Sequence, residues 1–276
     1  MTLNTRNKLI MSFFILTILF IIIISTIISI SLFTGHTVMP QNVSRLSDFL
    51  GDTLLTGYNF MSALLSAIIC VIYSAVIICI IYINFEKTQS AEIIYFAMFL
   101  MGCMMEGNRI LLLAYNIWAT VSSIYIFMGR ILFFGRMFST LSLIFLVLLS
   151  IKQDAHQDAG RNSVIIAAAA GVFAWLIPID TITVASNCSV RFGYEKSFIV
   201  ISCLCFITSY FAMRAQSKAL DSKQYKTASN GYISVVFGYL LLTQTDSIFI
   251  LSLGILLLLI GTYLFLTNLH RYYKWM

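Results

Sequence analysis

Long apolar segments, separated by short polar stretches, run along almost the whole chain. The first extends from Leu9 to Phe33 and is much longer than the roughly 7–15 apolar residues of a signal peptide, and it lacks an A-x-A cleavage pattern. We therefore expect it to be a retained transmembrane helix. A membrane β-barrel would instead show alternating segments of about ten residues, so the continuous runs predict an α-helical bundle.

The pattern predicts eight spans in a single transmembrane domain that covers residues 1–276. The seventh, Gly231 to Thr245, is the most ambiguous, because its 15 residues cover only about 22 Å as a helix and a span needs roughly 17–25 residues. If this segment were re-entrant, there would be seven spans. The predicted spans are residues 9–33, 58–85, 92–116, 118–150, 163–184, 197–213, 231–245 and 248–269.

The distribution of lysine and arginine favours eight spans. With both termini in the cytoplasm, the inner segments hold 11 of these residues and the outer segments three, in line with the enrichment of positive residues in cytoplasmic loops. The fold class that we expect is an all-α, polytopic integral membrane protein of the cytoplasmic (inner) membrane. Outer residues 34–57 carry apolar side chains at helical spacing, which fits an amphipathic helix in the interface or an ordinary polar loop. These side chains are Leu46, Phe49, Leu50 and Leu54.

Composition supports the membrane class and limits the partners. The chain is 60% hydrophobic and only 10% charged, whereas soluble domains are roughly 25% charged. Its net charge of +6 is spread over short loops and is not gathered on one polar face, so we expect membrane lipids as partners and no nucleic acid. Of the six cysteines only Cys188 lies in a loop. We therefore expect no disulfide framework, no zinc site and no cofactor.

Charged residues inside the third and fourth spans are the main functional clue. A charge in hydrocarbon costs at least about 2.5–3.5 kcal/mol, so such residues normally face the bundle interior and pair. The spans are joined by a short link and predict an antiparallel hairpin, in which residues equidistant from the turn lie at similar depth. Glu106 and Arg130 are each about 12 residues from the expected turn, or roughly 18 Å inward, and we expect them to pair. Arg109 is the i+3 neighbour of Glu106.

The remaining candidates lie around this pair. Arg136 is six residues beyond Arg130, so it looks into a different groove or reaches the inner interface. Asn108 lies beside Arg109. A kink at Pro178 could aim Asp180 at Arg109, or Pro178 and Asp180 simply mark a helix end that reaches the interface. Four glycines flank the charges and favour close helix packing, or else clear space for a ligand. They are Gly102, Gly107, Gly129 and Gly135.

The charge of this cluster suggests what it binds. Glu106 with three arginines sums to +2, and arginine matches carboxylate and phosphate in two-point contacts. Our leading hypothesis is a non-enzymatic protein that binds an anionic small molecule or lipid headgroup, for transport or for sensing through a partner protein. The arginines would hold the anion and Glu106 would orient them.

Two alternatives stay open at this point. One is a membrane-embedded enzyme acting on a lipid-linked phosphate, with Glu106 as base and Asp180 as the second group. The other is a scaffold subunit in which a Glu106–Arg130 clasp only sets helix register. Hydrolase, Walker A and zincin motifs are absent, so no catalytic residue is assigned. The DAHQD segment brings Asp154, His156 and Asp158 together, but three ligands without a fourth are typical of a solvated loop.

Overall fold

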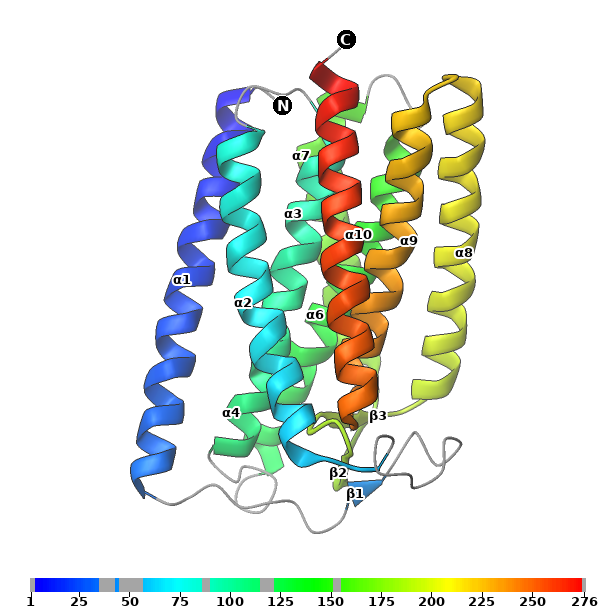
Figure 1. Cartoon of the computed structure of the whole chain (residues 1–276). Coiled ribbons are helices and arrows are strands. Elements are labelled where there is room, and N and C mark those ends of the chain that lie inside the picture. Colours follow the sequence, from blue (N-terminus) through cyan, green and yellow to red (C-terminus); the bar gives the residue numbers. More distant parts are fainter. Residues whose placement is uncertain are drawn as a thin grey trace.

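Helices that run back and forth between two ends make up most of the computed structural model, and both chain ends lie at the same end of the bundle (Figure 1). The described residues are 3–34, 43–44, 57–85, 90–114, 122–150 and 155–274. The helices are α1 Leu3–Thr34, α2 Phe60–Asn84, α3 Ala91–Met104, α4 Asn108–Ala114, α6 Ser122–Ser150, α7 Ala155–Leu176, α8 Glu195–Ala219, α9 Lys223–Thr243 and α10 Ile248–Lys274. A 3₁₀ turn, η1, spans Met105–Gly107, and the strands are β1 Val43–Ser44, β2 Ile179–Ala185 and β3 Val190–Phe192.

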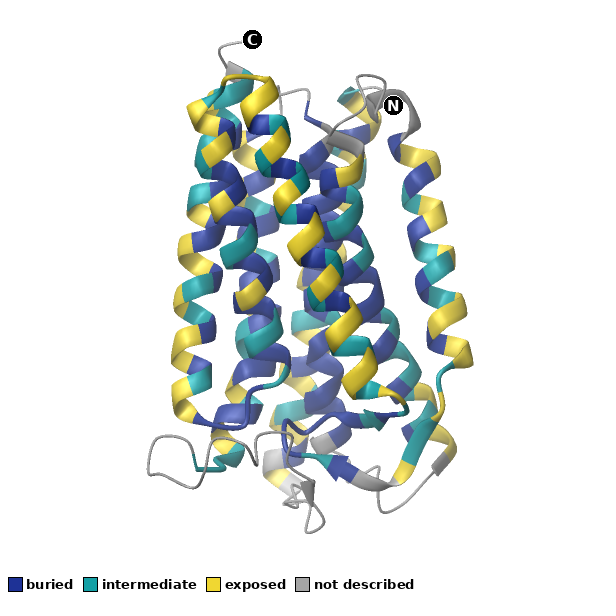
Figure 2. Ribbon diagram, turned by 90° about the vertical axis from the view of Figure 1, so that its right-hand side faces the viewer, coloured by how far each residue is buried: buried dark blue, intermediate teal, exposed yellow. Residues whose placement is uncertain are grey.

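The helical bundle predicted from the apolar runs is confirmed. Among the described residues, six helices are long and apolar enough to cross a membrane, namely α1, α2, α6, α7, α8 and α10. The broken segment α3–η1–α4 and the more polar α9 run alongside them (Figure 1). Buried residues face the inside of the bundle and exposed ones its outer surface (Figure 2). Many exposed side chains are large and apolar, as a lipid-facing surface requires.

The pairing of α9 with α10 explains how a helix of modest hydropathy is accommodated. Glycines recur seven residues apart on both helices, Gly231 and Gly238 on α9 and Gly254 and Gly261 on α10. A Cβ on Gly238 would lie 2.5 Å from the backbone nitrogen of Leu258, and one on Gly231 would lie 2.6 Å from that of Phe265. Such contacts are possible only without side chains, so the two backbones touch and α9 buries one face against α10.

The helix in the region of the fifth predicted span has different ends from that span. This helix, α7, begins at Ala155, inside the stretch expected to be a cytoplasmic loop, and it ends at Leu176 instead of near residue 184. Pro178 removes a backbone donor and disfavours helix at the residue before it. The β-branched residues that follow favour a strand. The fold is therefore not purely α-helical.

Strands β1, β2 and β3 form a small sheet at the end of the bundle opposite the chain termini (Figure 1). β1 pairs in parallel with β2, and β2 pairs antiparallel with β3. Apart from β1, the predicted amphipathic segment lies outside the described residues. So do the side chains of the DAHQD loop.

The ambiguous seventh span is longer than expected. Helix α9 begins at Lys223, where the Ser222 side chain accepts a hydrogen bond from the backbone nitrogen of Tyr225 at 3.3 Å. Its 21 residues extend over about 32 Å. The stretch predicted to be the most basic loop is therefore largely helical, and only residues 220–222 separate α8 from α9.

Candidate functional site

Three charged side chains meet in the interior of the bundle. Arg136 of α6 forms a two-point contact with Glu106, with Nε 2.9 Å from Oε1 and Nη2 3.3 Å from Oε2. Arg109 of α4 approaches the same carboxylate, with its Nε 3.0 Å from Oε2. All three residues are buried, and Arg109 has no exposed surface. One carboxylate thus serves two guanidinium groups, and the trio carries one surplus positive charge.

Local backbone features place these groups opposite one another. The 3₁₀ turn η1 interrupts the helix at Glu106, and a short 3₁₀ segment within a helix often marks strain or function. Where α3 crosses α6, a Cβ on Gly102 would lie 2.6 Å from the carbonyl oxygen of Gly135. The glycines therefore permit the close approach that lets Arg136 reach Glu106. Gly107 and Gly129 also lie against neighbouring side chains, so all four flanking glycines serve packing.

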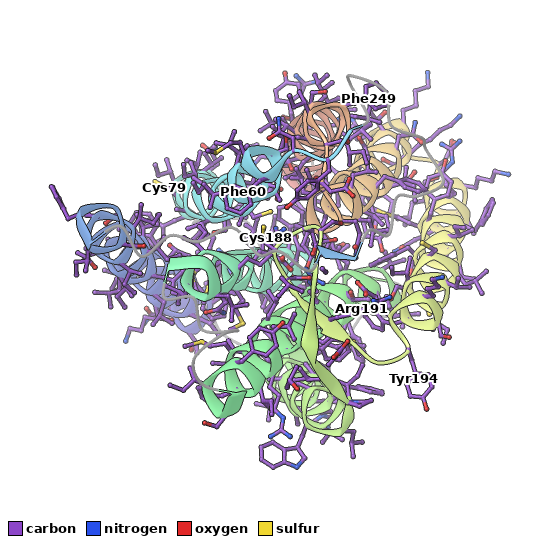
Figure 3. The ribbon with its side chains drawn as sticks, turned by 90° about the horizontal axis from the view of Figure 1, so that it is seen from below. Phe60, Cys79, Cys188, Arg191, Tyr194 and Phe249 are labelled. Atoms are coloured by element: carbon purple, nitrogen blue, oxygen red, sulfur yellow. The ribbon has the colours of Figure 1, made fainter. Side chains whose placement is uncertain are left out.

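The turn between β2 and β3 is inserted into the end of the helical bundle. Its residues 186–189 are all buried. Seen along the bundle axis in Figure 3, Cys188 lies near the centre of the bundle, while Arg191 and Tyr194 lie farther out. Gly193 follows at the other end of the hairpin, where its backbone nitrogen donates to the carbonyl of Pro178 at 2.8 Å. We call Ser186, Asn187, Cys188 and Ser189 the hairpin tip.

The hairpin tip contacts the charged trio directly. Arg109 Nη1 donates to the Asn187 carbonyl oxygen at 3.2 Å and to Ser66 Oγ of α2, also at 3.2 Å. Arg109 Nη2 has no hydrogen-bond partner in the described part of the chain, and the contact of Nε with Glu106 is an ion pair without hydrogen-bond alignment. A fully buried guanidinium with unused donors is energetically costly, so a hydrogen-bond acceptor placed beside Arg109 Nη2 would be stabilised.

The end of α9 completes the polar network. The carbonyl oxygen of Thr243 accepts from Asn187 Nδ2 at 2.7 Å and from Arg136 Nη2 at 3.4 Å. Carbonyls in the last turn of a helix lack partners within the helix and carry partial negative charge, which favours a nearby cation. Asn187 Oδ1 in turn accepts from Ser189 Oγ at 2.6 Å. The hairpin tip therefore joins α4, α6 and α9 around Glu106.

A second anchor ties the tip to the α9–α10 turn. Ser186 Oγ donates to Asp246 Oδ2 at 3.1 Å, and the backbone nitrogen of Asn59 donates to the Asp246 carbonyl at 2.8 Å. Asp246 is buried. This residue is therefore a structural junction between the hairpin, α2 and the α9–α10 turn.

The neighbouring thiol does not balance the surplus charge. Cys188 is buried in the hairpin tip, in a left-handed backbone conformation with φ of 59°. Burial raises its pKa to about 12, although Arg109 acts in the opposite direction. At neutral pH the thiol is therefore protonated and supplies no negative charge.

Arg130 was predicted to pair with Glu106, and this prediction was wrong. Its guanidinium carbon instead lies 4.1 Å from the centre of the Trp175 ring of α7, a cation–π contact. Glu106 and Arg136 have their sequence midpoint at position 121, about three residues beyond the expected turn. That difference shifts the partner by six residues, which is about 9 Å along α6 and 120° around it.

The other two candidate residues also lie outside the trio. The side chain of Asn108 donates to the Met105 carbonyl at 3.0 Å, within its own helix segment. Asp180 lies on β2, opposite Arg191 of β3. Sequence reasoning missed Ser66, Asn187 and Thr243, which come from three other segments and act partly through backbone atoms.

A small pocket adjoins the trio on the side of Arg136. It has a volume of about 30 Å³ and lies between α6, β3, α8 and α9. Its wall includes Arg136, Phe192, Glu195 and Thr243. Ligand pockets for organic molecules occupy about 300–1,000 Å³, so this one suits one or two waters or a small ion. Among the described residues no group of His, Cys, Asp and Glu has the arrangement of a metal site.

Comparison of the chain with models of known protein families, with curated proteins and with solved structures gave no match.

Proposed function

We propose that this chain is a non-enzymatic, multi-pass protein of the cytoplasmic membrane that binds a small anion at Glu106, Arg109 and Arg136. In this proposal it crosses the membrane eight times, with α3–η1–α4 and α9 as the two crossings beyond the six strongly apolar helices. Both termini then lie in the cytoplasm, because that orientation puts 11 lysines and arginines inside and three outside.

The observation that carries the proposal is the state of Arg109. It is fully buried, it shares one carboxylate with Arg136, and its Nη2 lacks a hydrogen-bond partner in the described residues. A desolvated cation in this position gains from an anion that accepts its unused hydrogen bonds. Glu195 lies within electrostatic range of Arg136 and lines the same small pocket, but it is only partly buried.

Size defines the class of anion. The pocket of about 30 Å³ adjoins the site on the side of Arg136, while Glu106 and Arg109 are not among its lining residues, and its volume suits a halide or an ion of similar size better than a lipid headgroup or a lipid-linked phosphate. Asp180, the second group that the enzymatic alternative needs, lies on the hairpin and has no described contact with Glu106. Both arguments favour binding over catalysis.

The hairpin tip could couple anion binding to a movement that a partner protein detects. Arg109 has no exposed surface and donates to the Asn187 carbonyl, so an anion can enter only if the tip shifts. Binding and tip position are then thermodynamically linked. We propose that the protein senses the anion through this movement and passes it to a partner protein, because α9 and the α9–α10 turn are bonded to the same tip.

A scaffold without a ligand is the second candidate. It is favoured by the two-point contact of Arg136 with Glu106, which already gives the carboxylate a strong internal partner. In a scaffold, the trio and the hairpin tip would simply fix the register of α3, α4, α6 and α9.

Thermal unfolding of the detergent-solubilised full chain in chloride separates the candidates. Chloride is titrated against gluconate at constant ionic strength. A ligand that binds only the folded state stabilises it by about 2.7 kcal/mol at 100 times its Kd. We expect Tm to rise with chloride for the native chain and to stay flat for Arg109→Gln. Arg130→Gln is the matched control and should respond like the native chain, because Arg130 lies outside the trio.

Two results would contradict anion binding. If Tm of the native chain does not depend on chloride, the scaffold is correct. If Arg109→Gln and the native chain respond equally, chloride acts elsewhere. Should Arg109→Gln fail to fold, the chloride titration of the native chain still separates the candidates, because a scaffold without a ligand predicts no dependence of Tm on chloride.

A further inference from the structure

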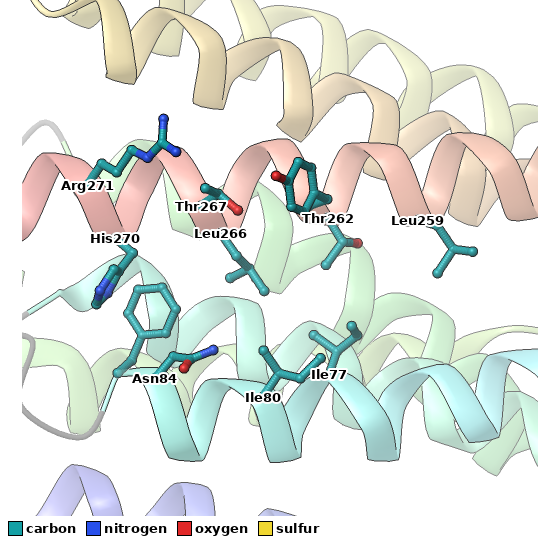
Figure 4. Close-up of a pocket in the computed structure, with 11 residues that line it drawn as sticks. Ile77, Ile80, Asn84, Leu259, Thr262, Leu266, Thr267, His270 and Arg271 are labelled. Atoms are coloured by element: carbon teal, nitrogen blue, oxygen red, sulfur yellow. The ribbon is translucent and has the colours of Figure 1, made fainter.

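A long hollow lies between α2 and α10, and none of the three charged residues lines it. Its larger part has a volume of about 450 Å³, and a second part of about 200 Å³ continues between the same two helices. The two parts share Ile77 and Leu259, so they form one groove. We call it the α2–α10 groove. Figure 4 shows Ile77 and Ile80 of α2 opposite Leu266 of α10 across the gap.

Polarity changes steadily along this groove. The end nearest the chain termini is lined by Asn84, His270 and Arg271. The smaller part, farther from the chain termini along α2 and α10, is lined almost entirely by aliphatic residues. Between Arg271 and Ile255 the groove follows 16 residues of α10, or about 24 Å. One leaflet of the hydrocarbon core is about 15 Å thick, so the groove has room for one acyl chain and the headgroup region above it.

The polar groups at the floor of the groove are hydrogen-bonded to one another. Tyr73 and Thr262 face each other there, with their hydroxyl oxygens 2.6 Å apart. Thr262 also donates to the Leu258 carbonyl within α10. These polar atoms satisfy one another, so they do not require water and an apolar chain can pass over them. Exposed apolar residues border the groove, including Val76 of α2 and Tyr263 of α10, so it opens toward the lipid.

Positive charge gathers at the polar end. Arg271 is exposed and belongs to the lining of the groove, although Figure 4 shows its guanidinium on the side of α10 away from α2, while His270 points into the gap toward α2. His270 Nδ1 is buried and has no hydrogen-bond partner in the residues that the structure covers. Arg6 of α1 donates to the Phe85 carbonyl, which brings a third basic group to the same end. None of the described residues that line the groove is acidic.

We infer that the α2–α10 groove binds an anionic diacyl phospholipid. One acyl chain lies along the aliphatic part, and the phosphate lies at the polar end, within reach of Arg271 and His270. The long side chain of Arg271 can extend to the headgroup from its exposed position. Neither the groove nor its charges include a residue of the proposed anion site, so the two proposals stand or fall separately.

Native mass spectrometry of the purified full chain tests this lipid site. The protein is equilibrated with phosphatidylglycerol or phosphatidylcholine, and the retained lipid is counted as the detergent is removed. We expect retention of one phosphatidylglycerol with at least about tenfold preference over phosphatidylcholine. Arg271→Glu should abolish the preference, and Ile80→Trp should abolish retention by filling the groove, as should Leu259→Trp from the opposite helix. Free glycerol phosphate should not bind, because it lacks the acyl chain.

Matched controls exclude general effects of charge and bulk. Lys218→Glu reverses an exposed charge on α8, and Val172→Trp adds bulk to the exposed surface of α7. Both should retain phosphatidylglycerol like the native chain. Equal retention of the two lipids by the native chain would overturn the inference. So would unchanged phosphatidylglycerol retention in both groove-filling variants, or a loss of equal size in the controls.

Discussion

At the scale of single residues, Glu106 pairs with Arg136 because the two side chains lie at the same position along the bundle axis. Both lie on neighbouring helices whose close crossing at Gly102 and Gly135 sets their register. A charge in hydrocarbon must find its partner at its own level, because the cost of a buried unpaired charge far exceeds that of a small helix shift. The geometry therefore predicts that the trio responds as a unit to substitution.

Glu106→Gln should strongly destabilise the protein. It leaves two buried guanidinium groups without a counter-charge, and removal of one partner of a buried pair costs about 3–5 kcal/mol. Arg130→Gln should cost no more than about 2 kcal/mol, because it loses only a cation–π contact with Trp175. Thermal unfolding in detergent measures both.

The double variant Glu106→Gln/Arg136→Gln provides the internal control. If the two residues act as a pair, its destabilisation should be smaller than the sum of the single effects by at least about 1 kcal/mol. Additive effects would show that the contact between Glu106 and Arg136 contributes little, and the trio would then lose its central role.

The sequence predicted that buried charges would converge here but not which arginine joins Glu106. An error of three residues in the position of a turn shifts the expected partner on the second helix by six residues, which is about 9 Å along that helix and 120° around it. Ser66, Asn187 and Thr243 were out of reach for a different reason. Their role depends on contacts between distant segments of the chain. Ser66 and Asn187 lie 43 and 78 residues from Arg109. Asn187 and Thr243 lie 56 residues apart.

At the scale of elements, the β2–β3 hairpin shows where hydropathy misleads. Residues 179–184 are apolar enough to extend a span, and a short apolar run does not distinguish strand from helix. Pro178 was the local signal, since a helix usually ends before proline. The insertion of the tip into the bundle has no local signal, because Ser186 and Asp246 are 60 residues apart.

The contact between α9 and α10 should be sensitive to a single methyl group. Gly238→Ala places a Cβ 2.5 Å from the Leu258 nitrogen, so the two helices must separate. Overpacking of this kind costs about 1–3 kcal/mol. Gly171→Ala of α7 is the matched control, because its Cβ would have nothing within 4 Å.

The control substitution should be neutral or stabilising, by up to about 1 kcal/mol, because alanine is the better helix former. Unfolding of both variants in detergent gives the comparison. A Gly238→Ala variant as stable as Gly171→Ala would mean that α9 and α10 are not in backbone contact.

At the scale of the whole molecule, the run of apolar segments was sufficient to predict a helical membrane bundle. It was insufficient for α9, because that helix is hidden against α10 and needs little hydropathy of its own. Its polar start at Lys223 made it look too short to cross. If α3–η1–α4 is one crossing, as we propose, whether α9 crosses decides between eight spans and seven, and therefore on which side of the membrane the C-terminal end lies.

Cysteine accessibility in intact and permeabilised cells tests this topology. Tyr194 and Phe249 are exposed residues at the starts of α8 and α10, which both begin at the end of the bundle that carries the sheet (Figure 1), whereas Leu220 is exposed in the turn between α8 and α9. If α9 crosses, an impermeant maleimide should label Tyr194→Cys and Phe249→Cys in intact cells, and Leu220→Cys only after permeabilisation. The native chain sets the background, which should be low at Cys188 because that thiol is buried and protonated. Labelling of Phe249→Cys only after permeabilisation, together with Leu220→Cys, would mean that α9 turns back within the membrane and that the chain has seven spans.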